Sequence, residues 1–372
     1  QAHQERVQTH QERVAAADRE HQERLARTTE HDASERRVTE LFTSAVEHLG
    51  NDKAAVRLGG LYALERLAVE HPEHRQAIVD VVCAYLRMPY PGQDEPGPAG
   101  MEVKHEESVR QAAQQVLLRH LRSDAPSHWP GVRVDLAGAR LRGFDASGCH
   151  FGEVLFHHAV FVHDAHFDGA VFDQVSRWSG TRFGGRAVFA DAEWKAPVVF
   201  DEPHFGGEVV FDRARFDREM TFRSASPVEQ PVSFRRATFG QAAVFDRMEF
   251  ARPISFSRAT FERTVSFEHT RMRADASFRG VSFNDDAMFR WASFHGCAEF
   301  ESARFAGDAA FGRATFLEQV IFGPHPMGGL VRFRDCRIAG EAPRIWPAGW
   351  REKPVDDTWR TLVPDQLGDS PG

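Results

Sequence analysis

One group of residues in the sequence has side chains that could bind a metal ion. Five histidines lie close together along the chain, with Asp164 among them: His150, His157, His158, His163 and His166. Imidazole nitrogens and carboxylates are zinc ligands, but this spacing matches no standard zinc pattern. This region belongs to a sequence repeat that is described below, and the repeat would place His158, His163 and Asp164 on neighbouring sides of the fold, with their side chains pointing outward. Ordinary surface histidines are the favoured interpretation, and no metal site is predicted.

Other combinations of residues point to no reaction. The sequence has no phosphate-binding loop, no GxSxG or HExxH motif and no glycine-rich dinucleotide fingerprint. Gly59-Gly60 follows no strand pattern, so it is not a phosphate loop. The acid pairs Asp201-Glu202 and Asp285-Asp286 are interleaved with arginine and are interpreted as solvated. We therefore expect no catalytic residue and no cofactor, and we expect that the chain is not an enzyme.

A regular spacing of large apolar side chains organises the chain from position 134 to position 338. Steps of five positions alternate with steps of six, and a small or β-branched residue precedes each large one by two positions. Met272 and Phe322 fall on this spacing. The phenylalanines predicted to form the core are Phe256, Phe261, Phe267, Phe278, Phe283, Phe289, Phe294, Phe300, Phe305, Phe311 and Phe316.

This spacing predicts a β-solenoid. On an α-helix, residues five apart differ by about 140° and residues two apart by about 200°, so the two series would face different directions. In a strand, by contrast, residues two apart point to the same side. A short repeat that buries one large and one small residue per step is typical of stacked parallel coils. Phe would then stack on Phe at strand spacing, about 4.8 Å.

Three segments resemble the A-x-F version of pentapeptide repeats: Ala214-Arg215-Phe216, Ala259-Thr260-Phe261 and Ala314-Thr315-Phe316. The resemblance implies a mainly β fold, a right-handed quadrilateral β-helix with four short sides per coil. Four steps, alternately five and six positions long, make one coil, which predicts about nine coils. The six-residue steps depart from the family's strict five. We expect the additional residue to bulge outward at alternate corners.

The spacing has exceptions. After Phe222 the next expected position is Pro227, but the following aromatic residue comes one position late, so Ser226–Pro231 is predicted to loop out by one residue. Met327 falls on the spacing. The tail from Gly340 carries Trp346, Trp350 and Trp359, and we expect it to cover the last coil, because the end of a solenoid exposes apolar side chains.

Before the solenoid the sequence predicts helices at residues 3–49, 53–71, 73–87 and 103–122, with a loop at Pro89–Gly100. Gly50 is expected to end the first helix, and Asn51 or Asp52 to cap the second. Gly59-Gly60 indicates a close approach between helices. The predicted domains are a polar stalk or linker (1–34), an α-helical bundle (35–122), a linker (123–133), the solenoid (134–339) and a C-terminal cap or tail (340–372).

The first helix contains HQERV twice and HQERL once, and its apolar stripe is thin. Two interpretations of this helix remain open. It is either a solvated linker, or a stalk or weak coiled coil that supports oligomerisation. Residues 38–122 resemble a helical module that precedes pentapeptide repeats in actinobacterial proteins, many of which carry transmembrane helices upstream. No apolar run approaches the length expected of a membrane span, at least about 18 residues. We expect a cytoplasmic location, on the cytoplasmic face of a membrane if an anchor precedes Gln1.

The charge of the sequence favours one of the two functions considered for the solenoid over the other. The chain has a net charge of −8, and residues 134–340 contain 27 acidic and 25 basic residues. Pentapeptide-repeat proteins suggest DNA mimicry that modulates DNA gyrase or topoisomerase, as in quinolone resistance, but such a role requires strongly negative faces. A scaffold that binds a protein partner fits the near-neutral rod better, and no direct nucleic-acid binding is expected. The four cysteines have no CxxC spacing and are expected to be reduced and buried.

Overall fold

The chain consists of two compact units, Gln1–Ile78 and Val79–Gly372. The computed structural model describes residues 2–90, 100–323, 329–339 and 342–365, and for residues 2–19 and 26 it describes the backbone alone. Most of the predicted loop Pro89–Gly100 lies outside the described residues, and so does Met327. The predicted domain boundaries remain predictions.

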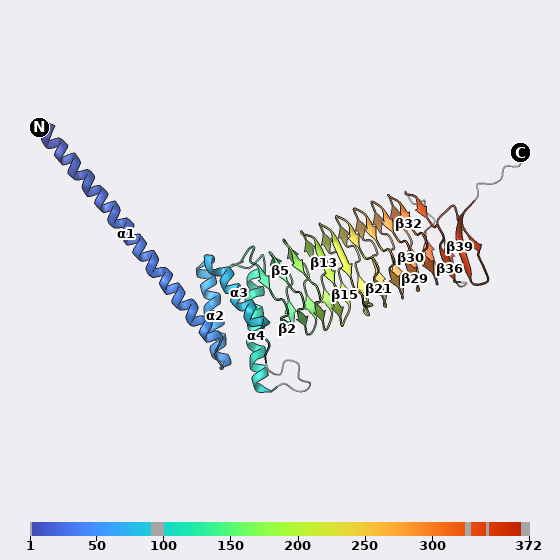
Figure 1. The fold of residues 1–372 in the computed structure, drawn as a ribbon, viewed down its shortest axis with the longest axis horizontal. Coiled ribbons are helices and arrows are strands. Elements are labelled where there is room, and N and C mark those ends of the chain that lie inside the picture. Colours follow the sequence, from blue (N-terminus) through green and yellow to red (C-terminus); the bar gives the residue numbers. More distant parts are fainter. Residues whose placement is uncertain (1, 91–99, 324–328, 340–341, 366–372) are drawn as a thin grey trace. The chain divides into compact units, whose positions relative to one another are not determined.

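Four α-helices precede the strands in the described residues, as predicted (Figure 1). Their bounds are α1 (Ala2–Leu49), α2 (Ala54–Glu70), α3 (Arg75–Arg87) and α4 (Met101–Leu121), with a 3₁₀ helix, η1 (Pro72–His74), before α3. The predicted cap of α2 is wrong. Lys53 occupies the cap position, and the Asn51 side chain instead accepts a hydrogen bond from the Lys53 N–H at 2.9 Å. None of the described helices is both long and apolar enough to cross a membrane.

The apolar stripe predicted for α1 is only partly buried. Val38 and Leu49 lie in the core of the first unit, while Leu25 and Leu41 are more than half exposed. The side chains of Val7 and Val14 lie outside the described residues.

The two glycines of α2 differ in their surroundings. A Cβ on Gly60 would lie 2.6 Å from the Ala45 carbonyl oxygen and 2.7 Å from the Leu49 nitrogen, both on α1. A Cβ on Gly59 would meet no atom within 4 Å. The predicted close approach of helices therefore involves Gly60 alone.

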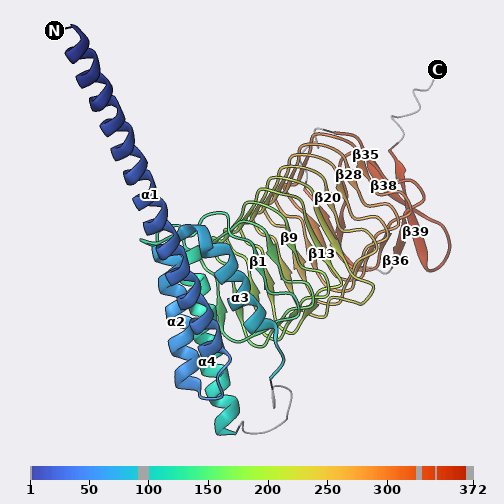
Figure 2. The ribbon, with the colours of Figure 1, turned by 60° about the vertical axis from the view of Figure 1, so that its left-hand side comes forward.

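The strands form a four-sided parallel β-solenoid of about nine turns (Figures 1 and 2). Side 1 is a ladder of ten strands: β1 (Val134–Asp135), β5 (Val154–Leu155), β9 (Ser176–Arg177), β13 (Val198–Asp201), β17 (Met220–Arg223), β20 (Ala243–Val244), β24 (Val265–Ser266), β28 (Ala287–Met288), β32 (Ala309–Ala310) and β35 (Val331–Arg332).

Side 2 contains two ladders: β2 (Arg140–Leu141), β6 (Val160–Phe161), β10 (Arg182–Phe183) and β14 (His204–Phe205), followed by β21 (Glu249–Phe250), β25 (Arg271–Met272), β29 (Ser293–Phe294), β33 (Thr315–Phe316) and β36 (Arg337–Ala339). The second ladder continues into an antiparallel hairpin of β38 (Trp350–Pro354) and β39 (Trp359–Pro364).

Side 3 contains ten strands: β3 (Phe144–Asp145), β7 (Ala165–His166), β11 (Ala187–Val188), β15 (Val209–Val210), β18 (Val232–Ser233), β22 (Ile254–Ser255), β26 (Ala276–Ser277), β30 (Ala298–Phe300), β34 (Val320–Phe322) and β37 (Arg344–Ile345). Side 4 contains eight: β4 (His150–Phe151), β8 (Val171–Phe172), β12 (Glu193–Trp194), β16 (Arg215–Phe216), β19 (Thr238–Phe239), β23 (Thr260–Phe261), β27 (Ser282–Phe283) and β31 (Arg304–Phe305).

Corner geometry explains why five-residue and six-residue steps alternate. A five-residue step, such as Phe267 to Met272, turns through one residue with positive φ, here His269 at 58°. A six-residue step, such as Met272 to Phe278, contains no described residue with positive φ and uses its additional residue to turn. From the second coil to the last, the described residues with positive φ lie only at the corners between sides 1 and 2 and between sides 3 and 4, whereas Gly349, with φ of 88°, lies beyond the coils.

The predicted core phenylalanines lie in the interior of the solenoid, each at most 1% exposed. Along sides 3 and 4 the rings stack from coil to coil. Phe256 stacks on Phe278 with centroids 5.4 Å apart, and Phe261 on Phe283 at the same distance. These columns place the large side chains inside the rod and leave the residues between them on its surface.

One coil is a single residue longer than the coils on either side of it. Val209 pairs with Val232 and Phe216 with Phe239, so partners across this coil lie one position further apart in sequence than Val232 and Ile254 do in the next. The buried Val228 takes the inward place on side 2 that was predicted for Pro227, so the additional residue lies between Arg223 and Val228. Here the ladder of side 2 is interrupted.

Both ends of the solenoid are covered. At the start, Leu86, Leu117 and Leu121 pack with Phe144 and Phe151 of the first coil. At the other end, the Trp346 ring lies 5.9 Å from that of Phe322, centroid to centroid, and Trp350 meets Phe333 edge-on.

Candidate functional site

Among the described residues, no three ligand atoms from the histidine group of the early coils lie within 4.8 Å of one another. His157 and His158 have ring centroids 6.1 Å apart, and His166 faces Asp168 at 3.4 Å. His158 occupies a corner with positive φ and lies over Gly180 of the next coil.

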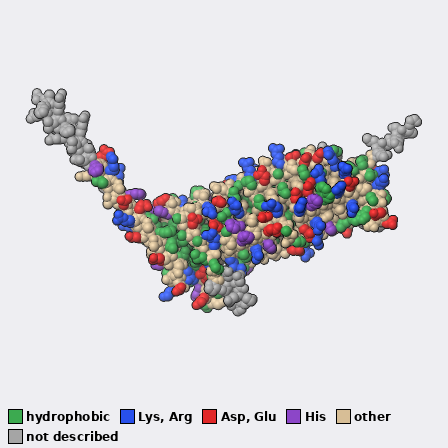
Figure 3. Space-filling view, viewed as in Figure 1, with side chains coloured by type: hydrophobic (Ala, Val, Ile, Leu, Met, Phe, Trp, Pro, Cys, Tyr) green, Lys and Arg blue, Asp and Glu red, His purple; other side chains and the backbone are tan. Residues whose placement is uncertain are grey.

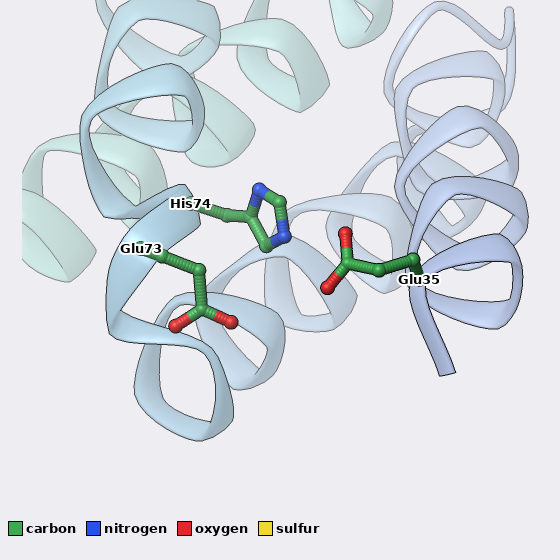
Figure 4. Close-up of side chains that lie close together, drawn as sticks. All are labelled: Glu35, Glu73 and His74. Carbon is green, nitrogen blue, oxygen red and sulfur yellow. The ribbon is translucent and has the colours of Figure 1, made fainter. Parts of the chain in front are cut away.

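A different trio brings metal-ligand atoms together, within the first unit. Single ligand atoms of Glu35 from α1 and of Glu73 and His74 from η1 lie within 4.8 Å of one another (Figure 4). The Nε2 atom of His74 is buried and has no hydrogen-bond partner among the described residues. The sequence offered no signal for this trio, because Glu35 lies far from the adjacent Glu73 and His74 along the chain.

The two carboxylates of this trio are exposed, an arrangement that is common on protein surfaces without an ion. Glu73 also faces the Nδ1 atom of His71 at 3.3 Å. A hydrogen bond from its own backbone N–H, with a smaller contribution from His71, lowers the pKa of Glu73. The trio is a group of polar neighbours and does not define a functional site.

The outer surface of the solenoid carries charges of both signs that pair between coils. Arg213 donates hydrogen bonds of 2.7 and 2.6 Å to Asp191, one coil away, and Lys195 donates one of 2.8 Å to Asp173. In Figure 3 basic and acidic side chains are interspersed along the visible face of the solenoid. Neighbouring coils therefore neutralise one another's charges locally.

One corner of the solenoid presents an exposed aromatic side chain. Trp291 lies between sides 1 and 2 with φ of 56°, and it is 42% exposed. Its ring stacks on that of His269 one coil earlier, with centroids 4.8 Å apart and planes 4° apart. On the other side, the Arg313 guanidinium lies 5.8 Å from the ring centroid. The three side chains form a continuous strip, which we call the Trp291 strip.

The Trp291 strip combines an exposed tryptophan with a histidine and an arginine. Trp and Arg are enriched among the residues that dominate binding energy at protein interfaces. Trp178 and Trp194, the other tryptophans of the coils, are buried. Position 291 could be recognised in the sequence only as a corner residue, because its large side chain falls off the core spacing.

The four cysteines are free. Burial raises the pKa of Cys83, Cys149 and Cys336 to about 12 and that of Cys297 to about 11, so the thiols are unreactive near neutral pH. Cys297 is only half-buried, which corrects the expectation that all four are buried.

The comparisons with known proteins support the repeat. A sequence profile of pentapeptide repeats, spanning nine copies, matches residues 245–290. Neither the curated proteins nor the solved structures contain a significant match to the chain. The matched segment covers β21 to β28, and the same four-sided coils continue on both sides of it. Residues 245–290 therefore match pentapeptide repeats, and they form part of a parallel β-solenoid of about nine turns.

Proposed function

We propose that this chain is a non-catalytic scaffold whose solenoid binds a protein partner through the Trp291 strip. The observation that carries the proposal is the 42% exposure of Trp291 on a rod whose other described aromatic columns point inward. Stacking against His269 and Arg313 holds the indole in place, so a partner would meet a preordered surface.

Charge supports an acidic contact surface on the partner. Arg247 occupies the same corner two coils before Trp291. Arg290 is the residue before Trp291, and the Arg334 carbonyl oxygen accepts a hydrogen bond from the Arg313 N–H at 2.7 Å. Arg290 faces Glu268 at 3.5 Å and Arg334 faces Asp335 at 3.7 Å, so these two acids beside the strip are already paired. The partner's carboxylates would meet Arg247 and Arg313.

Modulation of DNA gyrase by DNA mimicry is less well supported. Mimicry needs an extended negative face, since its target surface binds phosphates. Ion pairs between coils, such as Arg213–Asp191, cancel the carboxylates that such a face would use. A supercoiling assay tests the alternative: protection or inhibition of gyrase at sub-micromolar protein would favour mimicry over the scaffold.

The helix α1 and the cellular location extend the proposal. We propose that α1 supports self-association, because its described side chains before Val38 are exposed and its sequence repeats HQERV. Light scattering of the full chain, compared with a chain that lacks residues 1–34, tests this: equal masses would contradict it. We also propose a cytoplasmic location, which fractionation of cells would check.

A photo-crosslinking amino acid at position 291 tests the scaffold directly. The matched control is position 258, an exposed corner residue with φ of 60° between sides 3 and 4. We expect one protein to crosslink at 291 and not at 258. With that protein purified, Trp291→Ala should weaken binding at least tenfold, which corresponds to about 1.4 kcal/mol or more of binding free energy. Equal affinity of wild type and Trp291→Ala would remove the Trp291 strip from the interface.

A further inference from the structure

One face of the solenoid presents more basic than acidic side chains. It covers the second ladder of side 2, from β21 to β36, and consists of three columns of outward residues with one residue per coil. They are a corner column (247, 269, 291, 313 and 335), a strand column (249, 271, 293, 315 and 337) and a third column (251, 273, 295, 317 and 339). We call these three columns the side 2 face, and Trp291 is the middle residue of its corner column.

Five exposed arginines and two acids occupy the side 2 face: Arg247, Arg271, Arg273, Arg313 and Arg337 against Glu249 and Asp335. Both acids are already paired. Arg271 and Arg273 share Glu249, at 3.7 and 2.6 Å, and Asp335 faces Arg334 at 3.7 Å. Arg313 and Arg337 lie over the rings of Trp291 and Trp359 instead, each 5.8 Å from the centroid. Among the described residues, Arg247, Arg313 and Arg337 have no carboxylate within ion-pair distance.

The arginines that share Glu249 leave an excess of positive charge at the neighbouring His295. Burial lowers the pKa of His295, the charges of Arg273 and Arg271 lower it further, and Glu249 opposes them with a smaller effect. One carboxylate therefore does not cancel the two guanidinium groups with which it pairs. The positive potential of the side 2 face favours an anionic partner.

The positions that border the side 2 face carry both signs of charge: Asp246, Glu268, Arg290 and Arg334 beside the corner column, and Arg252, Asp275 and Glu318 beside the third column. Asp246 and Asp275 each accept a hydrogen bond of 2.9 Å from a backbone N–H one coil further along. The positive excess is therefore a band about as wide as one side of the solenoid, with acids on both edges. Such a band suits a narrow acidic segment aligned with the solenoid axis, because like charges at the edges repel a broader acidic surface.

The spacing of the corner column favours an α-helix over an extended segment. Strands of neighbouring coils lie about 4.8 Å apart, so Trp291 lies about 10 Å beyond Arg247, and Arg313 about 14 Å beyond it. On an α-helix, residues i, i+7 and i+11 share one face and lie at about 0, 10.5 and 16.5 Å along the axis. In a strand, side chains on one face lie about 7 and 13 Å beyond the first, so Trp291 would fall between two of them.

With the Trp291 strip as the binding surface of the proposed function, we propose that the protein partner presents an acidic α-helix, which lies along the solenoid axis on the side 2 face. Its carboxylates at i and i+11 pair with Arg247 and Arg313, which have no acidic partner in the described part of the chain. An apolar side chain at i+7, or at i+4 if the helix runs the other way, covers the exposed indole of Trp291.

Binding of a designed peptide to the full chain tests this proposal. The probe is a fluorescein-labelled, stapled helix with Glu at i and i+11 and Leu at i+4 and i+7, so it fits either direction. A control peptide of the same composition has its second Glu at i+9, on the opposite face of the helix. By fluorescence anisotropy the probe should bind about two- to fivefold more tightly than the control, the effect of one exposed ion pair. Equal affinities, or no binding of either peptide, would overturn the acidic helix.

Single-stranded nucleic acid is the competing partner, because bases can stack on an exposed tryptophan beside arginines. A fluorescein-labelled oligothymidylate serves as its probe in the same assay. We expect it to bind more weakly than the helical peptide. Tighter binding of the oligothymidylate would overturn the proposal in favour of a nucleic-acid partner.

Charge reversal locates the helix on the solenoid. Arg247→Glu and Arg313→Glu should each weaken binding of the probe, whereas Arg258→Glu, at an exposed corner between sides 3 and 4, should not. A second peptide with Lys in place of Glu at i should bind the first two variants more tightly than it binds wild type. Such recovery in one variant or in both supports the placement, and recovery in neither contradicts it. Circular dichroism and the unfolding midpoint show that each variant folds.

This inference and the proposed function fail separately. A protein that crosslinks at position 291 while neither peptide binds would contradict the acidic helix alone. Trp291→Ala should weaken binding of the probe. Wild-type affinity of Trp291→Ala for the probe, with binding that still depends on Arg247 and Arg313, would contradict the Trp291 strip alone.

Discussion

The rings of Phe289 and Phe311 stack with centroids 4.7 Å apart and planes 2° apart, one coil separating the two residues. Their separation equals the spacing of hydrogen-bonded strands, about 4.7–4.9 Å, so backbone pairing and ring stacking reinforce each other. Phe289 also meets Phe278 and Phe300 edge-on in neighbouring columns. The core is thus a lattice in which each ring touches neighbours within its coil and between coils.

Replacing Phe289 with Ala should lower the free energy of unfolding by about 3–5 kcal/mol, because it leaves a cavity that the stacked coils cannot close. Denaturant unfolding measures this change. Met288→Ala is the matched control, since Met288 is the adjacent residue and points outward from the same strand. A Phe289→Ala variant as stable as Met288→Ala would contradict the inward stack.

The two glycines of α2 should respond to alanine in opposite ways. Gly59→Ala should stabilise the protein by about 0.5–1 kcal/mol, because Ala favours helix and no atom lies within 4 Å of the new Cβ. Gly60→Ala should destabilise it, since Cβ would lie 2.6 Å from the Ala45 carbonyl oxygen. Thermal unfolding followed by helical circular dichroism measures both. Equal shifts for the two variants would disprove the close approach at Gly60.

A corner arginine should tolerate glycine better than its neighbour. Arg236 has φ of 57°, a conformation that costs an L-residue about 1–2 kcal/mol and glycine almost nothing. Arg236→Gly should therefore raise the unfolding midpoint. Arg235→Gly, next to it and also exposed, should lower it, because Arg235 has no positive φ and glycine adds freedom to the unfolded chain. Midpoints that move in the same direction would argue against strain at this corner.

Glu352 should make the C-terminal hairpin sensitive to acid. The carboxylate accepts hydrogen bonds from Trp346 at 2.8 Å and from Arg344 and Arg360 at 3.3 Å. Burial alone would raise the pKa of Glu352, but these hydrogen bonds and the charge of Arg344 outweigh it and lower the pKa. The folded state therefore gains stability above the unfolded pKa, about 4.3, and loses it as the pH falls through the lower folded pKa.

Glu352→Gln measures this contribution. The variant should be less stable than wild type by about 1.5–3 kcal/mol at pH 7, the range for hydrogen bonds to a charged group. The difference should shrink as the pH falls below the folded pKa, where the wild-type carboxyl is also neutral. A difference that stays constant from pH 7 to acid would show that the charge of Glu352 does not hold the hairpin.

The repeat made the interior of the solenoid predictable, while its corners and ends required the structure. Phe256 and Phe283 follow from spacing alone, because strand alternation fixes which residues point inward. The positive φ of Trp291 does not, since residue type gives no sign of it. The cavity beside the first coil could not be predicted either, because two of its lining residues, Gln114 and Arg142, belong to different elements that come together only when α4 packs on the first coil.

The cap of α2 and the irregular coil show the same limit at the level of single residues. Asn51 is a good capping residue by type, yet the helix begins after Lys53, where no side chain caps it. Pro227 was expected to hold the inward place of its coil, and Val228 holds it instead. Each choice depends on where neighbouring segments pack, which local propensity does not encode.

The additional residue before Val228 shows that the solenoid tolerates a change in the length of a single coil. The strands before and after it keep their partners, Val209 with Val232 and Val232 with Ile254, so a change of length at one corner does not shift the coils beyond it. The length of one coil can therefore change while the strand pairing of the other coils stays the same. A peptide tag or a longer loop inserted between Arg223 and Val228 would protrude from one coil, and the other coils would keep their strand register.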